Sequence, residues 1–319
     1  MIPKTGPHSE HFTFHPLADG VWAAIATSTG LAGSNSGIVD TGDQTIIFDT
    51  TLSPASAIEL RAVAEHLTGR QVSCVLNSHL DRDHVFGNAV FSSQTMIYST
   101  KLTREKMAEQ TPGDILEFKK KWTELQEEWI EGAKAAKDEA ERLDFEDGVR
   151  FAKRIIDTFP QLEVRLPDHV FNDQLEFKGT KRTIRFITFG GGHTDSDALL
   201  HLPAEQIIFT GDLLVVKNHS ALFKGHPRKW LDILAKIKEL DPVYLVPGHG
   251  ELGTQTEVTL IERYISETLQ MAEQNWREGG TSESAAVLQP PAFTDGWDNS
   301  DIFGANMKFL HEVVQQKVQ

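Results

Sequence analysis

A short charged segment, NSHLDRDHVFGN at residues 77–88, constrains this chain more than any other feature. Two histidines and two aspartates fall within six consecutive positions, at His79, Asp81, Asp83 and His84. The preceding run, VSCVL, is short, apolar and rich in valine, which predicts a buried strand that ends where the charged residues begin. A hydrophobic core rarely holds so many ionisable groups. We therefore expect a binding site at the end of a strand.

The residue types in this segment are those that bind divalent transition metals. Alternate side chains of an extended chain point the same way, so His79, Asp81 and Asp83 would share one side. A turn at Asp83 and His84 would bring the fourth side chain to the same place. Imidazole and carboxylate groups are ligands of zinc, iron and manganese. The segment therefore predicts a metal site.

Three later segments repeat the combination of an apolar strand, a glycine and a potential ligand. His193 follows three glycines in ITFGGGHTDSD, Asp212 closes IIFTGD, and His249 lies between glycines in VYLVPGHG. A single histidine at a strand end is most often an ordinary hydrogen-bonded residue. Four strand ends of this kind, each beside a glycine that permits close backbone approach, indicate one shared site.

Charge and apolar runs exclude several classes of partner. The 31 basic and 46 acidic residues give a formal charge of −15, which argues against nucleic-acid or anionic-membrane binding. The start, MIPKTGPHSEHF, lacks the apolar segment of a signal peptide, and no later apolar run approaches the ~20 residues of a membrane span. We expect a cytoplasmic protein with a small-molecule substrate. Its single cysteine, Cys74, rules out an internal disulfide and is expected to be buried.

Apolar periodicity predicts the order of elements. Strands are expected over residues 11–51, a helix over 54–67, two helices in a charged insertion at 102–159, further strands from 169, and helices over 228–240, 256–277 and 301–317. The Gly/Ser-rich stretch TSTGLAGSNSG is either a flap over the site or an ordinary connecting loop. This order predicts two sheets packed together with helices outside.

Residues from about 20 to 250 resemble the metallo-β-lactamase superfamily. Its signature, H-x-[H/E/D]-x-D-H followed by a distal histidine, aspartate and histidine, matches the residues quoted above, together with HVFGN and FTGDLL. The resemblance implies an α/β (α+β) fold, a four-layer αββα sandwich with a dinuclear metal site along one edge. We expect this domain at residues 11–255, with the helical insertion at about 102–159 and a C-terminal helical extension at 256–319 packed on the same domain.

The resemblance also implies a ligand set and a reaction. The first metal would be held by His79, Asp81 and His193, the second by Asp83, His84 and His249, with Asp212 bridging both. Two divalent ions are expected, zinc foremost, with iron or manganese possible beside Asp81. A metal-bound hydroxide would then cleave an acyl bond of a small molecule, such as a lactone, lactam, ester or thioester. Asp83 is the candidate catalytic residue, which orients the hydroxide and carries a proton to the leaving group.

Two ligand positions depart from the most familiar members of the superfamily. Asp212 stands where the zinc β-lactamases of the best-known subgroup have cysteine, and Asp81 stands where most members have histidine. Asp195 and Asp197 are candidates to accept hydrogen bonds from ligand imidazoles, or else to cap turns. Four residues after Asp212 either contact the substrate or are ordinary loop residues: Lys217, His219, Lys224 and His226. The remaining histidines are expected to be structural: His8, His11, His15, His66, His169, His201 and His311.

Two rival functions remain open. His79, His193 and Asp212 alone form the two-histidine, one-carboxylate set of a mononuclear non-haem iron oxygenase, such as a persulfide dioxygenase. A degenerate, non-catalytic member is the other alternative, although no ligand position is apolar. The insertion could be a lid or pocket wall, or a dimerisation arm. A homodimer could form through the tail helices, which carry Trp276, Trp297 and Phe303.

Overall fold

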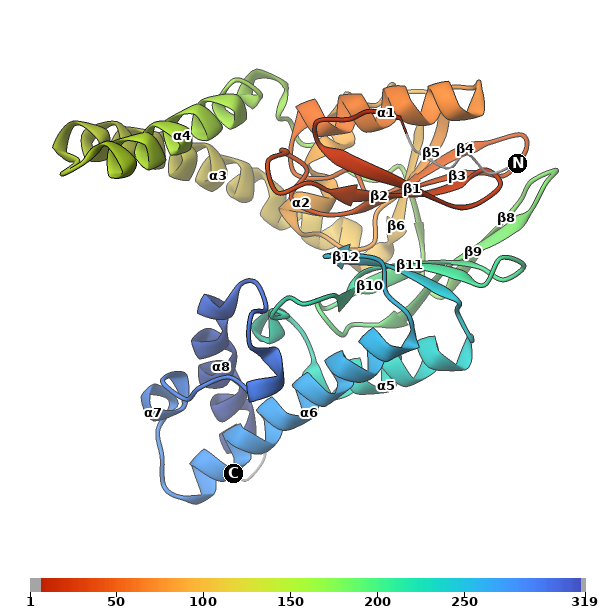
Figure 1. Cartoon of the computed structure of the whole chain (residues 1–319). Coiled ribbons are helices and arrows are strands. Elements are labelled where there is room, and N and C mark those ends of the chain that lie inside the picture. Colours follow the sequence, from red (N-terminus) through yellow and green to blue (C-terminus); the bar gives the residue numbers. More distant parts are fainter. Residues whose placement is uncertain (1–6, 317–319) are drawn as a thin grey trace.

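Two β-sheets pack face to face at the centre of the molecule (Figure 1). The structure is a computed structural model and describes residues 7–316. The first sheet contains, in spatial order, β1 (Phe12–Ala18), β2 (Val21–Ala26), β3 (Ser36–Asp40), β4 (Thr45–Phe48), β5 (Val72–Leu76), β6 (Met96–Thr100) and β7 (His169–Phe171). The second contains β12 (Tyr244–His249), β11 (Ile207–Val215), β10 (Asp197–Leu202), β9 (Thr183–Gly190) and β8 (Gln174–Lys178).

Side chains from both sheets interlock between them. Phe48 of the first sheet contacts Phe186 and Phe209 of the second, with ring centroids 6.4 Å and 5.8 Å apart. A Cβ at Gly37 would collide with the Phe209 ring, so only glycine fits opposite it. Cys74 is buried in this layer, as expected. The inner faces of the sheets therefore form one continuous apolar core.

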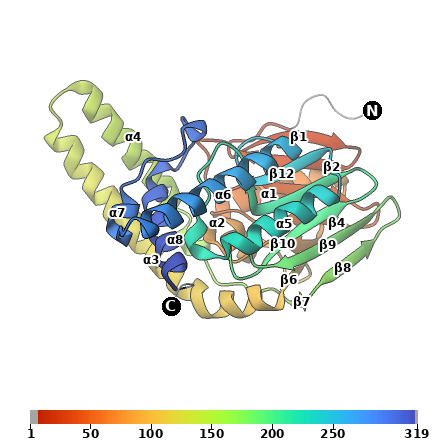
Figure 2. The ribbon, with the colours of Figure 1, turned by 90° about the horizontal axis from the view of Figure 1, so that it is seen from below.

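Helices cover the outer face of each sheet, which completes four layers. Helix α1 (Pro54–Thr68) lies on the first sheet and begins where the Ser53 side chain accepts a hydrogen bond from the Ser56 amide. Helices α5 (Pro227–Glu239) and α6 (Gln255–Arg277) lie side by side on the second sheet (Figure 2). The predicted αββα sandwich is confirmed.

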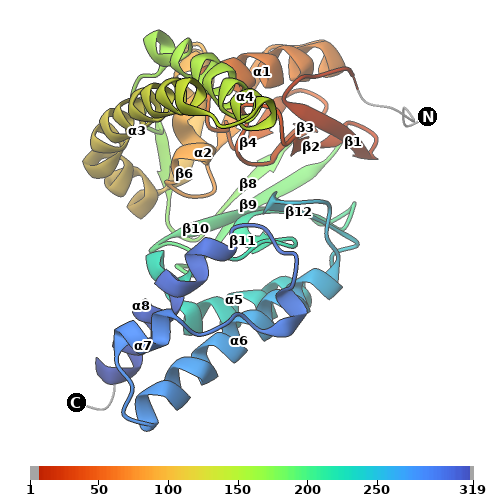
Figure 3. The same cartoon turned by 60° about the vertical axis from the view of Figure 1, so that its left-hand side comes forward.

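The insertion forms a long helical hairpin, α3 (Lys101–Ala135) and α4 (Glu139–Ile156), which projects from one end of the sandwich (Figures 1 and 3). Trp122 packs on Trp129 and on Phe151 across the hairpin. Near its base, Phe118 of α3 packs on Phe86, which lies within the charged segment of the sequence. The base of the hairpin is thus fixed to the segment that holds the predicted metal ligands.

The C-terminal helices pack on the second sheet and its helices. Helix α8 (Phe303–Gln316) corresponds to the helix that the sequence predicts over 301–317. The short helix α7 (Ser282–Ala286), which precedes it, is not predicted by the sequence. Phe303 is buried, and Trp276 and Trp297 pack against the same core, so these three side chains serve this chain's own interior. A homodimer through the tail helices stays a prediction. Among residues 7–316, no helix is long and apolar enough to cross a membrane.

The Gly/Ser-rich stretch at residues 27–37 connects β2 to β3, which begins at Ser36, and its second half is held by hydrogen bonds. Ser34 is buried and its hydroxyl donates to the Asp83 carbonyl. The Asn35 side chain donates to the carbonyls of Pro247 and Gly250, at 3.0 Å and 2.8 Å. The loop therefore ties the first sheet to the end of β12, close to the predicted site.

Candidate metal centre

Parallel strand pairs place the functional residues at one edge of each sheet. β4 and β5 run parallel with Phe48 opposite Leu76, so the residues that follow them, Asp49 and the start of the charged segment, lie side by side. The Asp49 amide donates to the Leu76 carbonyl at 2.9 Å. β11 and β12 are also parallel. The Ala198 amide of the second sheet donates to the Ser78 carbonyl at 2.8 Å, which joins the two edges.

The charged segment is extended only as far as Asp81. Helix α2 (Arg82–Val85) begins there, with the His84 amide donating to the Asp81 carbonyl at 2.9 Å. The expectation of extended alternation through Asp83 is wrong, because a helical turn rotates successive side chains by about 100°. That rotation separates Asp83 and His84 from His79 and Asp81. The segment thus supplies two groups of ligands instead of one.

The second sheet supplies three side chains from different backbone settings. His193 lies in the loop after β9, and His249 is the last residue of β12. Asp212 lies within β11, which continues to Val215, so its predicted place at a strand end is wrong. The pairing of β11 with β12 is irregular on both sides of Gly211, whose φ is +53°. At that break the buried Asp212 side chain lies against His193 and His249.

Gly248 of the VPGHG segment explains how the Asp212 carboxylate fits there. A Cβ on Gly248 would collide with Asp212 Oδ1. Only glycine lets the carboxylate lie against the backbone of β12. The glycine that precedes His249 in the sequence is therefore required by the position of the Asp212 carboxylate.

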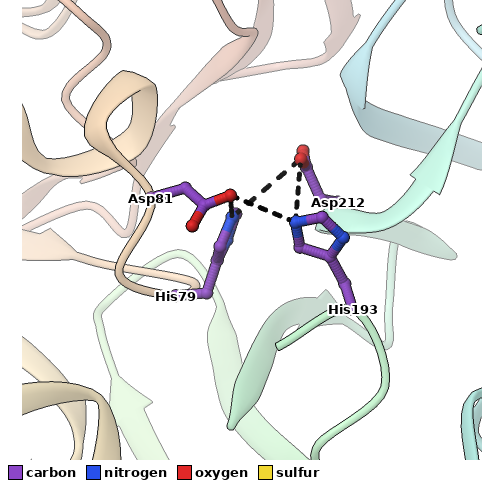
Figure 4. Close-up of side chains that lie close together, drawn as sticks. All are labelled: His79, Asp81, His193 and Asp212. Atoms are coloured by element: carbon purple, nitrogen blue, oxygen red, sulfur yellow. Dashed lines mark hydrogen bonds and ion pairs between the residues drawn. The ribbon is translucent and has the colours of Figure 1, made fainter. Parts of the chain in front are cut away.

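His79, Asp81, His193 and Asp212 converge as the first group, with potential ligand atoms within 4.8 Å of one another (Figure 4). His193 Nε2 lies 3.3 Å from Asp81 Oδ2 and 3.4 Å from Asp212 Oδ2. His79 Nε2 lies 3.8 Å and 3.9 Å from the same two oxygens. Ligands about 2.1 Å from a tetrahedral ion lie roughly 3.4 Å from one another, so these spacings suit a divalent cation.

Asp83, His84 and His249 form the second group. Asp83 Oδ2 lies 3.2 Å from His249 Nε2 and 3.7 Å from His84 Nε2. Asp212 reaches this group as well, with Oδ1 3.1 Å from His84 Nε2 and Oδ2 3.4 Å from His249 Nε2. Asp212 is therefore the carboxylate that contacts both groups, as the resemblance implies for a bridging ligand.

Unpaired polar atoms support a cation at this site. His79 Nε2, His84 Nε2 and Asp212 Oδ1 are buried and form no hydrogen bond of acceptable geometry with any described residue. Leaving such atoms unpaired is costly. The other imidazole nitrogens are engaged, with His79 Nδ1 2.8 Å from Ser78 Oγ and His84 Nδ1 2.8 Å from Asp49 Oδ2. These contacts leave each Nε2 to serve as the ligand atom.

The pKa values reflect concentrated negative charge. Burial alone would raise the pKa of Asp83, but His84 and His249 hold it at about 2. Burial alone would lower the pKa of His249, but Asp212 and Asp83 raise it to about 10. The pKa of Asp212 is held well below its usual range, since its three imidazole neighbours outweigh its burial. Without a cation, protons on the histidines would balance the carboxylates.

Asp49 is a buried carboxylate of the candidate site that sequence reasoning misses. It is fully buried, and its carboxylate accepts hydrogen bonds from the Ser78 amide and hydroxyl, both at 2.7 Å, in addition to contacting His84. Its φ of +59° is unusual for a residue other than glycine. An aspartate directly after the apolar strand TIIF was a signal of the same kind as those used for the other ligands.

Asp195 and Asp197 do not contact the ligand imidazoles. Asp197 accepts hydrogen bonds from the Gly192 and Thr194 amides and from the Thr194 hydroxyl, so it caps the loop that carries His193. Asp195 is exposed and pairs with Lys106 at 3.4 Å and with His226 at 3.2 Å. Of the two roles that the sequence leaves open for Asp197, the capping of a turn is the one found in the structure.

The loop after β11 contributes two side chains to the site. Lys224 Nζ lies 2.6 Å from Asp81 Oδ2. His219 is buried and lines a cavity of about 180 Å³ together with ligands of both groups. Lys217 and His226 do not line that cavity. None of the histidines expected to be structural belongs to either ligand group among the described residues.

A second, larger cavity of about 300 Å³ opens beside Asp81 and Asp83. Helix α3 forms one wall through Lys106, Gln110 and Asp114. The structure thus supports a pocket wall as the role of the base of the insertion. The distal part of the hairpin extends away from the sandwich (Figures 1 and 2).

Comparisons with known proteins agree with this fold. The curated relatives include a metallo-beta-lactamase type 2 from Bacteroides fragilis, 29% identical over 35% of this chain and 49% of that protein. A hydroxyacylglutathione hydrolase from Erythrobacter litoralis (strain HTCC2594) is 37% identical over 16% of this chain and 20% of that protein. The chain therefore spans about half or less of the curated relatives it matches.

Solved structures match over most of the chain. A metallo beta lactamase from Hirschia baltica superposes with a TM-score of 0.57 at 15% identity, covering 81% of this chain and 98% of that one. A metallo-beta-lactamase from Pontibacter korlensis gives 0.57 at 18% identity, over 80% and 99%. The model of the metallo-beta-lactamase superfamily matches residues 29–249, from the buried loop to the last ligand. The chain belongs to the metallo-β-lactamase superfamily.

Proposed function

We propose that this protein is a metal-dependent hydrolase that cleaves an acyl bond of a small molecule. The observation that carries the proposal is the convergence of seven potential ligands beside an open cavity of about 300 Å³. The first cation would be held by His79, Asp81 and His193, and the second by Asp83, His84 and His249, with Asp212 between them. Zinc fits the imidazole-rich donor set, and Asp81 leaves iron or manganese open.

The cations supply two forms of chemistry when bound: they lower the pKa of water toward neutrality and polarise a carbonyl oxygen. The protein's own residues fix where this chemistry acts. Asp49 and Ser78 hold the imidazoles of His84 and His79, so that each Nε2 faces the site. Such support typically changes metal affinity by about 10- to 100-fold.

Asp83 is the proposed catalytic residue. Its carboxylate is partly exposed and lines both cavities, so it can contact a bound substrate as well as the second ligand group. A carboxylate at this position can accept a proton from attacking water and deliver it to the leaving group. The low pKa of Asp83, caused by His84 and His249, keeps it ionised before the reaction.

The cavity favours a polar substrate. Its lining is almost entirely polar, with Leu80 as the main apolar group. The charged side chains of the lining are Arg82, Lys106 and Lys224, and Asp81, Asp83, Asp114 and Asp195. A long alkyl chain would find little apolar surface there. The names of the two curated relatives refer to a β-lactam and to hydroxyacylglutathione, both acyl compounds. A compact acyl substrate with polar substituents is therefore proposed.

One observation favours an oxygenase as the second candidate. Lys224 contacts Asp81 Oδ2, the oxygen nearest the imidazoles, and so competes with a cation for it. If Lys224 keeps Asp81 from binding the cation, His79, His193 and Asp212 remain as the two-histidine, one-carboxylate set of mononuclear iron enzymes. The complete second group of ligands favours the dinuclear hydrolase.

The test is an assay of metal-defined protein against lactones, lactams, esters and thioesters, with oxygen consumption measured in parallel on persulfides. Protein loaded with zinc should hydrolyse at least one acyl class without consuming oxygen. Oxygen uptake by iron-loaded protein, with no acyl hydrolysis, would replace the proposal with the oxygenase. Absence of both activities in fully loaded protein would favour a non-catalytic member.

A further inference from the structure

A chain of buried side chains links the C-terminal helices to the smaller cavity of the metal centre. It runs from Asn306 of α8 through Tyr264 of α6 to His219, in the loop after β11. Tyr264 and Asn306 are fully buried and His219 is 3% exposed. His219 also lines the cavity of about 180 Å³, alongside His193, Asp212 and His249.

The orientation of Asn306 is fixed at its end of the chain. The Leu222 amide, which can only donate, lies 2.7 Å from Asn306 Oδ1, so this atom is the amide oxygen. Asn306 Nδ2 then donates to the Ser220 carbonyl at 2.8 Å and to the Tyr264 hydroxyl at 3.2 Å. The Tyr264 oxygen is therefore an acceptor toward Asn306.

The Tyr264 hydroxyl must place its own hydrogen elsewhere. His219 Nδ1 lies 3.1 Å away and is the remaining hydrogen-bond partner of this hydroxyl among the described residues. If Nδ1 carried the hydrogen instead, the buried hydroxyl would have no acceptor, which is unfavourable. Tyr264 therefore donates to His219 Nδ1, and the neutral imidazole must carry its hydrogen on Nε2.

The surroundings of His219 keep it neutral and in place. Burial lowers the pKa of His219 and outweighs the opposing charge of Asp301. Its ring packs against Tyr264, Trp297 and Phe303, with centroids 5.4–6.0 Å apart. With Nδ1 engaged by Tyr264, Nε2–H is the polar group that this ring can present to the cavity. A protonated Nε2 cannot bind a cation, which separates His219 from the seven ligands.

We propose that His219 is a catalytic residue, whose Nε2–H donates a hydrogen bond to an oxygen of the acyl substrate, and that Tyr264 and Asn306 are positioning residues that fix this tautomer. The role in catalysis rests on the proposed hydrolase function. A preorganised donor of this kind stabilises the negative charge that develops on an acyl oxygen as water adds to the carbonyl carbon. The C-terminal helices thereby become part of the active site.

The tautomer is tested first, because it does not depend on turnover. Histidine labelled with ¹⁵N in zinc-loaded protein should give, for His219 at pH 7, the long-range correlation pattern of a neutral ring protonated at Nε2. Tyr264→Phe should weaken that preference and populate the other tautomer. Acetate, added as a carboxylate probe, should shift the Nε2–H resonance in the wild type. A wild-type ring protonated at Nδ1, or one insensitive to acetate, would overturn the proposal.

Catalysis is tested with a matched pair of variants. The amide nitrogen of glutamine can occupy the place of Nε2, whereas that of asparagine reaches only the place of Nδ1. His219→Asn should lower kcat by roughly 10- to 100-fold with KM nearly unchanged. His219→Gln should recover most of that loss, and both should keep the wild-type metal content. Equal kcat for His219→Asn and the wild type would overturn the proposal. A wild type that hydrolyses no acyl substrate would instead refute the hydrolase, while the tautomer and acetate results still stand.

Discussion

Lys224 Nζ lies 2.6 Å from Asp81 Oδ2, the same oxygen that lies 3.3 Å from His193 Nε2. The two side chains come from opposite sheets of the sandwich and meet at the first ligand group. The superfamily most often has a neutral histidine at the position of Asp81, as the resemblance implies. The ammonium group of Lys224 thus offsets the extra negative charge that Asp81 brings.

Removing this ammonium group should strengthen cation binding at the first group. Lys224→Met leaves Asp81 without its competing partner, so we expect about tenfold tighter zinc binding there; the partial exposure of Lys224 limits the effect. Chelator competition measures it, with Lys229→Met, an exposed lysine on α5, as the control. Asp81→His should also raise zinc affinity, and in that background Lys224→Met should give no further gain. Weaker binding in Lys224→Met would mean that the lysine orients Asp81 and does not compete.

The Asp49 carboxylate should matter for metal affinity although it is not a ligand. Asp49→Asn removes the charge that accepts hydrogen bonds from His84 and Ser78, so the His84 ring loses its fixed orientation. We expect a loss of about 10- to 100-fold in affinity at the second group. Isothermal titration of zinc into metal-free protein checks this, with Asp232→Asn on the exposed face of α5 as the matched control. Unchanged affinity would mean that packing alone positions His84.

The stability of the metal-free protein should depend on pH in a defined direction. The folded-state pKa of His249 is raised to about 10 by Asp212 and Asp83, despite its burial, so its contribution to stability is complete below about 6.5 and disappears as pH rises toward 10. The folded-state pKa of Asp83 is lowered to about 2, so its contribution to stability is complete above about pH 4 and disappears as pH falls toward 2. In chelator, the melting temperature should fall by roughly 5 °C between pH 6 and pH 9. In excess zinc this alkaline loss should vanish. A flat alkaline profile in chelator would contradict the protonated state of the histidines.

The helical hairpin should contribute to the site through its base alone. Lys106, Gln110 and Asp114 line the larger cavity, whereas the aromatic side chain of Trp129 in the distal turns packs within the hairpin, on Trp122. Replacing residues 125–148 by a short turn should leave the fold, the metal content and turnover within about twofold of the wild type. Gln110→Ala should instead raise KM, because it changes the cavity wall. Loss of turnover in the shortened protein, with metals retained, would show that the distal hairpin closes over the substrate.

The parts of this site that sequence reasoning predicts are those that follow from local pattern. The charged segment after an apolar strand identifies four side chains of the two groups, and a histidine or aspartate beside a glycine after an apolar run identifies the other three. The helical turn of α2 is not predictable, because four residues are too few to show a helical periodicity. The continuation of β11 past Asp212 is not predictable either, because it depends on the irregular pairing of β11 with β12. Asp49 carries the same strand-end signal as the ligands, and Lys224 is one of four candidates in its loop. Their contacts with His84 and Asp81, and that of Tyr264 with His219, depend on how the sheets and helices pack.

The central claim is that seven side chains hold two cations with Asp212 between them, and metal stoichiometry tests it most directly. Protein stripped with chelator is reconstituted with zinc, freed of excess metal and measured by plasma mass spectrometry. We expect two ions per wild-type chain. In Asp212→Ala we expect at most one ion and a loss of hydrolysis of about 100-fold or more. One ion in saturated wild type, or two ions with near-normal hydrolysis in Asp212→Ala, would contradict this claim.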